Sequence, residues 1–219
     1  MNVFFITDIH GNIAHLESSA ELIQKADLVL IAGDITNFGS VHDAEQILNK
    51  IRQLNKNIFA VAGNCDSQEI DGMFFDQGIG LNGTVRNWEQ LQLAGISGSL
   101  KTPTNTPFEY KEKDMEGTLE TIKKQMNGRP LLLVSHQPAF HTKTDRVMGW
   151  RHVGSKALRS FIEEIQPILT ISGHIHESVG MDNIGVTKVI NPGAFKDGHY
   201  GLAEIEGDSV SDLTWNRSK

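Results

Sequence analysis

Five short apolar runs constrain the fold of this chain more than any other feature of its sequence. They are rich in aliphatic and β-branched residues and end in polar or glycine clusters, as buried strands do. The runs span residues 3–7, 28–32, 58–62, 131–135 and 168–172. Apolar residues also recur at helical spacing within residues 13–23, 44–54, 115–126 and 158–165. Strands that alternate with helices predict an α/β fold with parallel strand pairing.

The rest of the chain predicts a second group of strands that lacks long helices between its members. Five further runs with strand character lie at residues 84–85, 91–96, 186–190, 201–205 and 210–215. We therefore expect two packed sheets, one from each half of the chain, with helices outside and a single domain over residues 1–219. The segments 97–113 and 137–153 are long and irregular, which is typical of functional or mobile loops.

The bulk properties exclude several classes of protein. The chain has 219 residues and a formal net charge of −7, which opposes a broad nucleic-acid surface rich in lysine and arginine. The single cysteine cannot form an internal disulfide, which fits a reducing compartment. No apolar stretch approaches the roughly 18 residues of a membrane span, and the N-terminus turns acidic too early for a signal peptide. We expect a cytoplasmic protein without a membrane partner, and its oligomeric state stays open.

Each of the five apolar runs is followed by side chains that can bind metal ions. Because sites form at the carboxyl ends of parallel strands, we expect these side chains to converge. Taken singly, each has an ordinary structural role as a turn residue, a helix cap or a buried histidine. Costly polar residues at five strand ends are better explained together by one shared site. The residues are Asp8, His10, Asp34, Asn64, His136, His174 and His176.

Four imidazoles, two carboxylates and one amide predict a site for transition metals. Such donors suit Mn, Fe, Zn, Ni or Co rather than Mg or Ca, which prefer oxygen ligands alone. Two divalent cations carry more charge than Asp8 and Asp34 neutralise, so the site would attract phosphate although the whole chain is acidic. Two such ions also lower the pKa of a water between them, which generates a hydroxide nucleophile.

The same residues form a set of short motifs: Asp8-Ile9-His10, Gly33-Asp34, Gly63-Asn64, Ser135-His136 and Gly173-His174-Ile175-His176. Their order and spread resemble the calcineurin-like metallophosphoesterase family. The resemblance implies a four-layer αββα sandwich, in which two mixed sheets are flanked by helices. It assigns one metal to Asp8, His10 and His176. It assigns the other to Asn64, His136 and His174, with Asp34 as the bridge between the two.

The leading prediction is a metal-dependent phosphoesterase in which a hydroxide between two cations, manganese among the candidates, attacks phosphorus in line. The expected substrate is a small phosphate ester, and a diester is favoured because no additional cationic pocket for a doubly charged monoester is evident. One alternative is a catalytically weak metal-binding scaffold that serves as a protein-interaction module, similar to the phosphoesterase-like subunit of retromer. A nuclease is a third hypothesis, which the acidic composition and short length disfavour.

Cys65 follows Asn64 at the position where many family members carry a histidine that contacts the phosphate and helps the leaving group depart. A thiol with a pKa near 8.5 is a weaker proton donor at neutral pH than an imidazole. A nucleophilic cysteine needs a nearby arginine, which the segment CDSQEID lacks, and plain packing is a further alternative. We interpret Cys65 as a spectator or weak substrate contact, as in similar bacterial and archaeal phosphodiesterases. Asp66 with Glu69 predicts a helix cap.

The long segment after His136 supplies further candidates. Arg151 is predicted to pair with a substrate oxygen, and His141 and His152 are candidates for a general acid. A solvated loop is the alternative for all three. The candidate catalytic residues are therefore Asp34, Asn64, Cys65 and Arg151.

Overall fold

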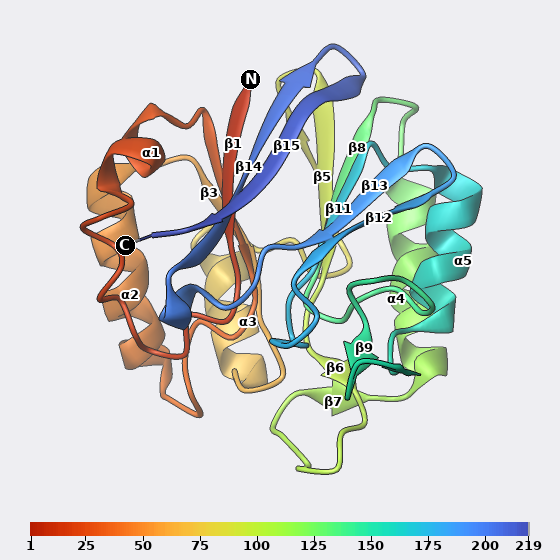
Figure 1. The fold of residues 1–219 in the computed structure, drawn as a ribbon, viewed down its shortest axis with the longest axis horizontal. Coiled ribbons are helices and arrows are strands. Elements are labelled where there is room, and N and C mark those ends of the chain that lie inside the picture. The colour runs from red at the N-terminus through yellow and green to blue at the C-terminus, as the bar shows by residue number, and fades with distance from the viewer. Residues whose placement is uncertain (219) are drawn as a thin grey trace.

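Two mixed β-sheets lie face to face at the centre of the computed structural model, which describes residues 1–218 (Figure 1). Lys219, the last residue of the predicted domain, lies outside the described residues. The strand order of the first sheet is β15 (Ser209–Arg217), β14 (His199–Glu206), β1 (Asn2–Ile6), β2 (Leu28–Ala32) and β3 (Ile58–Val61). This sheet is parallel over β1, β2 and β3, while β14 is antiparallel to both of its neighbours.

The second sheet has a parallel centre and an antiparallel strand at each edge. Its order is β12 (Gly180–Ile184), β13 (Thr187–Asn191), β11 (Leu169–Ile171), β8 (Leu131–Ser135), β5 (Leu91–Ile96) and β4 (Val85–Trp88). Two short strand pairs lie within the predicted irregular segments: β6 (Ser99–Leu100) with β7 (Glu109–Tyr110), and β9 (Arg146–Val147) with β10 (Arg151–His152).

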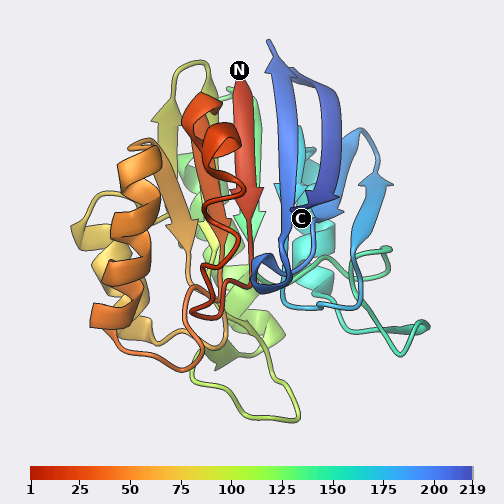
Figure 2. The same ribbon diagram turned by 60° about the vertical axis from the view of Figure 1, so that its left-hand side comes forward.

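Helices cover the outer face of each sheet, so the molecule has four layers (Figures 1 and 2). A short 3-10 turn, Phe195–Asp197, precedes β14. The first sheet is covered by α1 (Ala20–Lys25), α2 (Val41–Leu54) and α3 (Gln68–Asp76), and the second by α4 (Glu112–Gln125) and α5 (Lys156–Ile165). The predicted αββα class is confirmed.

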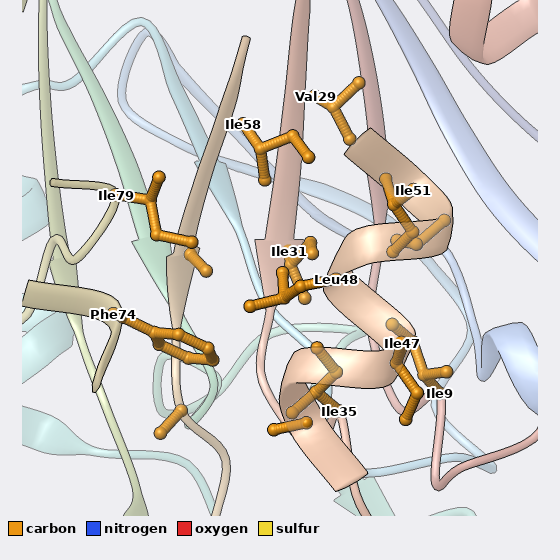
Figure 3. Packing of buried hydrophobic residues seen from close by; sticks show 14 of the residues in the cluster. Ile9, Val29, Ile31, Ile35, Ile47, Leu48, Ile51, Ile58, Phe74 and Ile79 are labelled. Atoms are coloured by element: carbon orange, nitrogen blue, oxygen red, sulfur yellow. The ribbon is translucent and has the colours of Figure 1, made fainter. Parts of the chain in front are cut away.

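Side chains on opposite faces of each central strand fill the spaces between the layers. In β1, Phe4 and Ile6 pack toward the helices, whereas Val3 and Phe5 pack toward the second sheet. Figure 3 shows the outer layer, where Leu48 of α2 and Phe74 of α3 lie against the first sheet. Side chains on both faces are buried, which is why the strands are continuous apolar runs in the sequence.

The prediction that each half of the chain builds one sheet is wrong in two places. β4 and β5 come from the first half but lie in the second sheet, and the last two strands, β14 and β15, lie in the first sheet. β14 returns to the first sheet and pairs with β1, from Asn2 opposite Glu204 to Phe5 opposite Gly201. The side chains of β14 alternate between buried and exposed, which suits an antiparallel strand beside an edge. Short apolar runs do not specify a partner strand, and the sequence therefore left this pairing undetermined.

The predicted helix over residues 13–23 is also shorter than expected, since only Ala20–Lys25 is helical. The Asn12 side chain accepts a hydrogen bond from the Ala14 amide at 3.0 Å and donates one to the Lys196 carbonyl at 2.9 Å. Such local bonds from an asparagine compete with helical bonding. Leu16 is nevertheless buried, so the apolar spacing predicted burial correctly although this part of the segment is not helical.

Helix α2 contains the predicted helical run 44–54 and begins three residues before it. Ser40 accepts a hydrogen bond from the Asp43 amide, and the Asp43 carboxylate accepts one from the Ser40 amide at 2.8 Å. This reciprocal arrangement satisfies amides at the helix start and stabilises it by about 1 kcal/mol. None of the described helices is long and apolar enough to cross a membrane.

Candidate metal centre

All seven predicted ligand residues follow strands whose carboxyl ends lie at the lower edge of the two sheets in Figure 1. β1, β2 and β3 run in parallel in the first sheet, as do β8 and β11 in the second, so their ends meet at one edge. The side chains come from both sheets: Asp8, His10, Asp34 and Asn64 from the first, and His136, His174 and His176 from the second.

One group of side chains forms around Asp8. The Nε2 atoms of His10 and His176 lie 3.2 Å apart, and His176 Nε2 lies 3.0 Å from Asp8 Oδ1. His10 Nε2 is 3.8 Å from the same carboxylate oxygen. Three donor atoms from the loops after β1 and β11 thus face one point.

A second group forms around His136. Its Nε2 atom lies 2.9 Å from Asn64 Oδ1, and its ring centroid lies 5.2 Å from that of His174. His136 is fully buried and Asn64 nearly so.

Asp34 lies between the two groups. Its Oδ2 atom is 3.6 Å from His10 Nε2 and 3.5 Å from His136 Nε2. One carboxylate oxygen therefore faces both groups.

These spacings fit shared metal ions. With metal–ligand bonds of about 2.1 Å, neighbouring ligand atoms of one ion lie about 3.0–3.4 Å apart. The six distances between donor atoms given above run from 2.9 to 3.8 Å and so bracket this range. Two imidazole nitrogens directed at each other, and a third directed at an amide oxygen, are expected where a cation lies between the partners.

Both carboxylates are held so that one oxygen faces the site. Asp8 Oδ2 accepts hydrogen bonds from Thr7 Oγ1 at 2.8 Å and from the His174 amide at 3.1 Å, which leaves Oδ1 toward His10 and His176. Asp34 Oδ1 accepts a hydrogen bond from the Cys65 amide at 2.8 Å, which leaves Oδ2 between the two groups. Outer contacts of this kind orient metal ligands.

His136 and Asn64 are oriented in the same way. His136 Nδ1 donates to the Ala32 carbonyl at 2.8 Å, so its Nε2 atom is directed into the site. The Asn64 amide donates to Thr106 Oγ1 at 3.0 Å, and the Thr106 hydroxyl donates to Glu109 Oε1 at 2.6 Å. This chain of bonds turns Asn64 Oδ1 toward His136.

The electrostatics of the site favour bound cations. Burial would raise the pKa of Asp8 and of Asp34, but the neighbouring histidines hold both pKa values below the usual range. Burial would lower the pKa of His136, yet the Asp34 charge raises it to about 9. For His174, burial and the His136 charge lower the pKa to about 4. Two buried carboxylates remain ionised and require compensating positive charge.

Four of the seven residues have left-handed backbone conformations, with φ of 54° at Asp8, 47° at His10, 50° at Asp34 and 68° at His174. Side chains adopt this region at a cost, and such residues cluster at functional sites.

The calcineurin-like phosphoesterase family model matches residues 1–178. The chain belongs to the calcineurin-like phosphoesterase family. An uncharacterized protein of Methanocaldococcus jannaschii is 35% identical over 198 residues, with 88% of each chain covered.

Solved structures share the calcineurin-like phosphoesterase fold at low identity. A protein of Thermus thermophilus is 16% identical with a TM-score of 0.78, over 100% of this chain and 99% of the other. A dimetal phosphatase from Danio rerio is 11% identical with a TM-score of 0.56, again over 100% and 99%. At these identities the likeness concerns the fold alone.

Cys65 lies among the candidate ligands rather than in the core alone. Its sulfur is within 4.8 Å of candidate ligand atoms of His10 and Asp34, and its side chain is buried. Burial, and then the Asp34 charge, raise the pKa of the thiol well above its ordinary value. The direct contact of Cys65 with a carboxylate is made by its backbone amide.

The prediction that Asp66 caps a helix is wrong, because Ser67 occupies the N-cap position of α3. Asp66 is fully buried and accepts hydrogen bonds from the amides of Ile35, Thr36 and Gly63 at 2.9–3.1 Å. Asp66 therefore joins the loop that carries Asp34 to the loop that carries Asn64. An aspartate three residues before a glutamate also fits a cap pattern, so the sequence signal was ambiguous.

A pocket of about 570 Å³ opens beside the second group and includes Arg151 with Asn64 and His174 in its lining. The other two candidates of that segment are engaged elsewhere. His152 Nδ1 lies 2.6 Å from Asp145 Oδ1, and His141 packs against His152 with ring centroids 4.7 Å apart.

Sequence reasoning missed the residues that orient the ligands, above all Thr7, Thr106 and Glu109. Thr7 directly precedes Asp8 at a strand end, which is a usable signal. Thr106 and Glu109 lie in an irregular segment more than 40 residues from Asn64, and the sequence contains no local signal for their contact with it.

Proposed function

We propose that residues 1–219 form a single domain that hydrolyses phosphate esters, more readily diesters, with two divalent transition-metal ions. The observation that carries this proposal is the position of Asp34 Oδ2, at 3.6 Å from His10 Nε2 and 3.5 Å from His136 Nε2. A carboxylate oxygen that faces two separate groups of donors is suited to bridge two ions.

In this proposal Asp8, His10 and His176 hold one ion, and Asn64, His136 and His174 hold the other. When bound, the two ions would lower the pKa of water at the site and offset charge on the phosphoryl oxygens. Mn, Fe, Zn, Ni or Co suits the mixed nitrogen and oxygen donors. The chain's own residues contribute a preorganised arrangement, because Asp8, Asp34, Asn64 and His136 are each buried and held by a further hydrogen bond.

Arg151 would bind a non-bridging phosphate oxygen from the pocket side. It is exposed and lines the pocket, whereas Lys101 of the same lining lies 3.8 Å from Glu109 and is partly neutralised by it. One available arginine suits a singly charged diester better than a doubly charged monoester.

A direct test measures hydrolysis of bis(4-nitrophenyl) phosphate after metal removal and after separate addition of Mn, Fe, Zn, Ni or Co. Activity should disappear with a chelator and return with at least one metal. Asp34→Ala should abolish activity and reduce bound metal, whereas Asp212→Ala, on an exposed position of β15, should change neither. Metal-free protein without turnover under every condition would support a binding module instead.

The leaving group provides a second test. The raised thiol pKa makes Cys65 a poor proton donor, so we propose that esters whose leaving groups need little protonation react faster. Aryl phosphodiesters should be hydrolysed much faster than alkyl phosphodiesters, and equal rates would reject this part of the proposal.

Substitution of the arginine tests its contact with substrate. Arg151→Ala should raise KM with a smaller change in kcat. Arg146→Ala, which removes the same charge from the partner strand β9 at an exposed site outside the pocket lining, is the matched control. An unchanged KM in Arg151→Ala would count against the contact.

A further inference from the structure

The pocket beside Asn64 and His174 has walls from two connections that are distant in sequence. One wall is the segment Leu100–Thr104 and the other is the β9–β10 hairpin, with Val147, Met148, Arg151 and Val153. Because Asn64 and His174 form its inner end, a phosphate held at the candidate metal centre would direct one organic arm into this pocket. Its volume of about 570 Å³ is within the usual size of small-molecule pockets.

The neutral polar groups of the pocket are already bonded within the protein. Thr102 Oγ1 donates to Glu109 Oε1 at 2.5 Å, and Thr104 Oγ1 lies 2.8 Å from Thr102 Oγ1. Since the Thr102 proton is directed to Glu109, the Thr104 hydroxyl donates to Thr102. Gln137 accepts from the Leu100 amide and donates to the Val153 carbonyl, each at 3.0 Å. These groups offer few hydrogen bonds to a ligand.

The remaining lining is apolar or cationic. Leu100, Pro103, Val147, Met148, Val153 and Ile175 supply apolar surface. Met148 is 75% exposed, although its backbone amide is fixed by the Glu177 carboxylate at 3.1 Å. Among the described residues that line the pocket there is no Asp or Glu, and the charged groups are Lys101 and Arg151.

We infer that this pocket selects phosphate esters whose organic arm is apolar, such as an aryl or branched alkyl group, over esters with a sugar or a cationic arm. The inference rests on the proposed function, because the metal centre must hold the phosphate. A sugar would lose hydrogen bonds to water and find few partners, at a cost of about 1–3 kcal/mol for each unsatisfied group. A cationic arm would face Arg151 and Lys101 without a lining carboxylate.

Competitive inhibition by monoesters with a single arm tests the inference. The probes are inorganic phosphate, phenyl phosphate, thymidine 5′-phosphate and phosphocholine, measured against metal-loaded protein. Phenyl phosphate should bind about tenfold more tightly than inorganic phosphate, a ratio expected for an apolar pocket. Thymidine 5′-phosphate and phosphocholine should bind with about the same affinity as inorganic phosphate, or more weakly. If either thymidine 5′-phosphate or phosphocholine bound as tightly as phenyl phosphate, or more tightly, the inference would be overturned.

Two exposed positions of the same hairpin provide a matched pair of variants. Met148→Ser should weaken the binding of phenyl phosphate at least threefold and leave the affinity for inorganic phosphate unchanged. Trp150→Ser changes a side chain that is 72% exposed and outside the lining, and it should affect neither probe. Phenyl phosphate that is unaffected in Met148→Ser would overturn the inference. Protein that binds neither metal nor inorganic phosphate would reject the proposed function itself.

Discussion

At the scale of single residues, the Thr106 hydroxyl determines which end of the Asn64 amide faces the metal centre. The hydroxyl has one proton, which it donates to Glu109, so it can only accept from Asn64 Nδ2. The amide oxygen is thereby turned toward His136. Thr106 touches no proposed substrate and acts as a positioning residue.

Thr106→Val should weaken the metal held by Asn64, His136 and His174. The valine removes the shorter of two contacts of Asn64 Nδ2 and leaves the one with Cys65 Sγ at 3.5 Å, so the amide is held less firmly. Loss of such an outer contact typically costs about 10- to 100-fold in metal affinity. Isothermal titration of the metal-free protein measures the affinity. Thr104→Val is the control, because Thr104 bonds to Thr102 and not to Asn64. Equal affinities in the two variants would contradict the positioning role.

Cys65→Ala should retain most of the hydrolytic activity. The Cys65 backbone amide, which alanine keeps, donates to Asp34 Oδ1 at 2.8 Å. Alanine removes the sulfur that accepts from Asn64 Nδ2 at 3.5 Å, but Nδ2 keeps its shorter bond to Thr106 Oγ1 at 3.0 Å. Rates on an aryl phosphodiester should stay within about threefold of the wild type, since no transition-state contact is removed. A loss of several orders of magnitude, with metal content unchanged, would indicate a nucleophilic or acidic thiol.

At the scale of elements, the close approach of the loops after β2 and β3 depends on Gly63. A Cβ atom there would lie 2.0 Å from Asp34 Oδ1 and 2.2 Å from the Asp34 amide nitrogen. Gly63→Ala should displace Asp34, destabilise the protein by several kcal/mol and reduce bound metal.

Gly72→Ala is the matched control for this change, because Gly72 lies in α3 and a Cβ atom there meets nothing within 4 Å. It should stabilise the protein by up to about 1 kcal/mol through helix propensity. Urea unfolding and elemental analysis measure both variants. Similar stability and metal content in the two would contradict the account of the loop contact.

The segment between β6 and β7 is held by the Glu109 carboxylate. Burial would raise the pKa of Glu109, but hydrogen bonds from Thr102 and Thr106 lower it to about 2. Because the folded pKa lies below the unfolded value, this group stabilises the fold above about pH 4.5. The contribution is lost as pH falls toward about 2.

Glu109→Gln should therefore be less stable than the wild type by about 2 kcal/mol near pH 6, since bonds to a charged acceptor are replaced. The difference should shrink as pH falls from about 4.5 to about 2. Denaturant unfolding of both proteins across this range measures it. A difference that stays constant with pH would contradict the role of the charge.

At the scale of the whole molecule, the sequence predicted the layers better than the connections. Continuous apolar runs such as residues 28–32 require cover on both faces, which leads to four layers. The return of β14 to pair with β1 was not predictable, because the pairing joins residues about 200 positions apart and depends on tertiary packing. Helix α1 was overpredicted because apolar spacing does not detect the side-chain bonds of Asn12.

The sequence predicted the candidate site as far as the positions of its residues depend on the ends of strands. All seven proposed ligands come from polar residues just after strands, and parallel pairing brings these ends together. The orienting contacts of Thr106 and Glu109 could not be predicted, since they come from an irregular segment whose path depends on the finished fold. The left-handed backbone at Asp8, Asp34 and His174 likewise has no direct signature in the sequence.

The central claim is that side chains from both sheets share two cations across Asp34. Anomalous diffraction at the manganese edge, from crystals grown with Mn²⁺, tests it most directly. We expect two peaks about 3.5–4 Å apart, one on each side of the Asp34 carboxylate. One peak should lie among Asp8, His10 and His176, and the other among Asn64, His136 and His174. Well-ordered crystals with no peak at Asp34, or with peaks only elsewhere, would contradict the account.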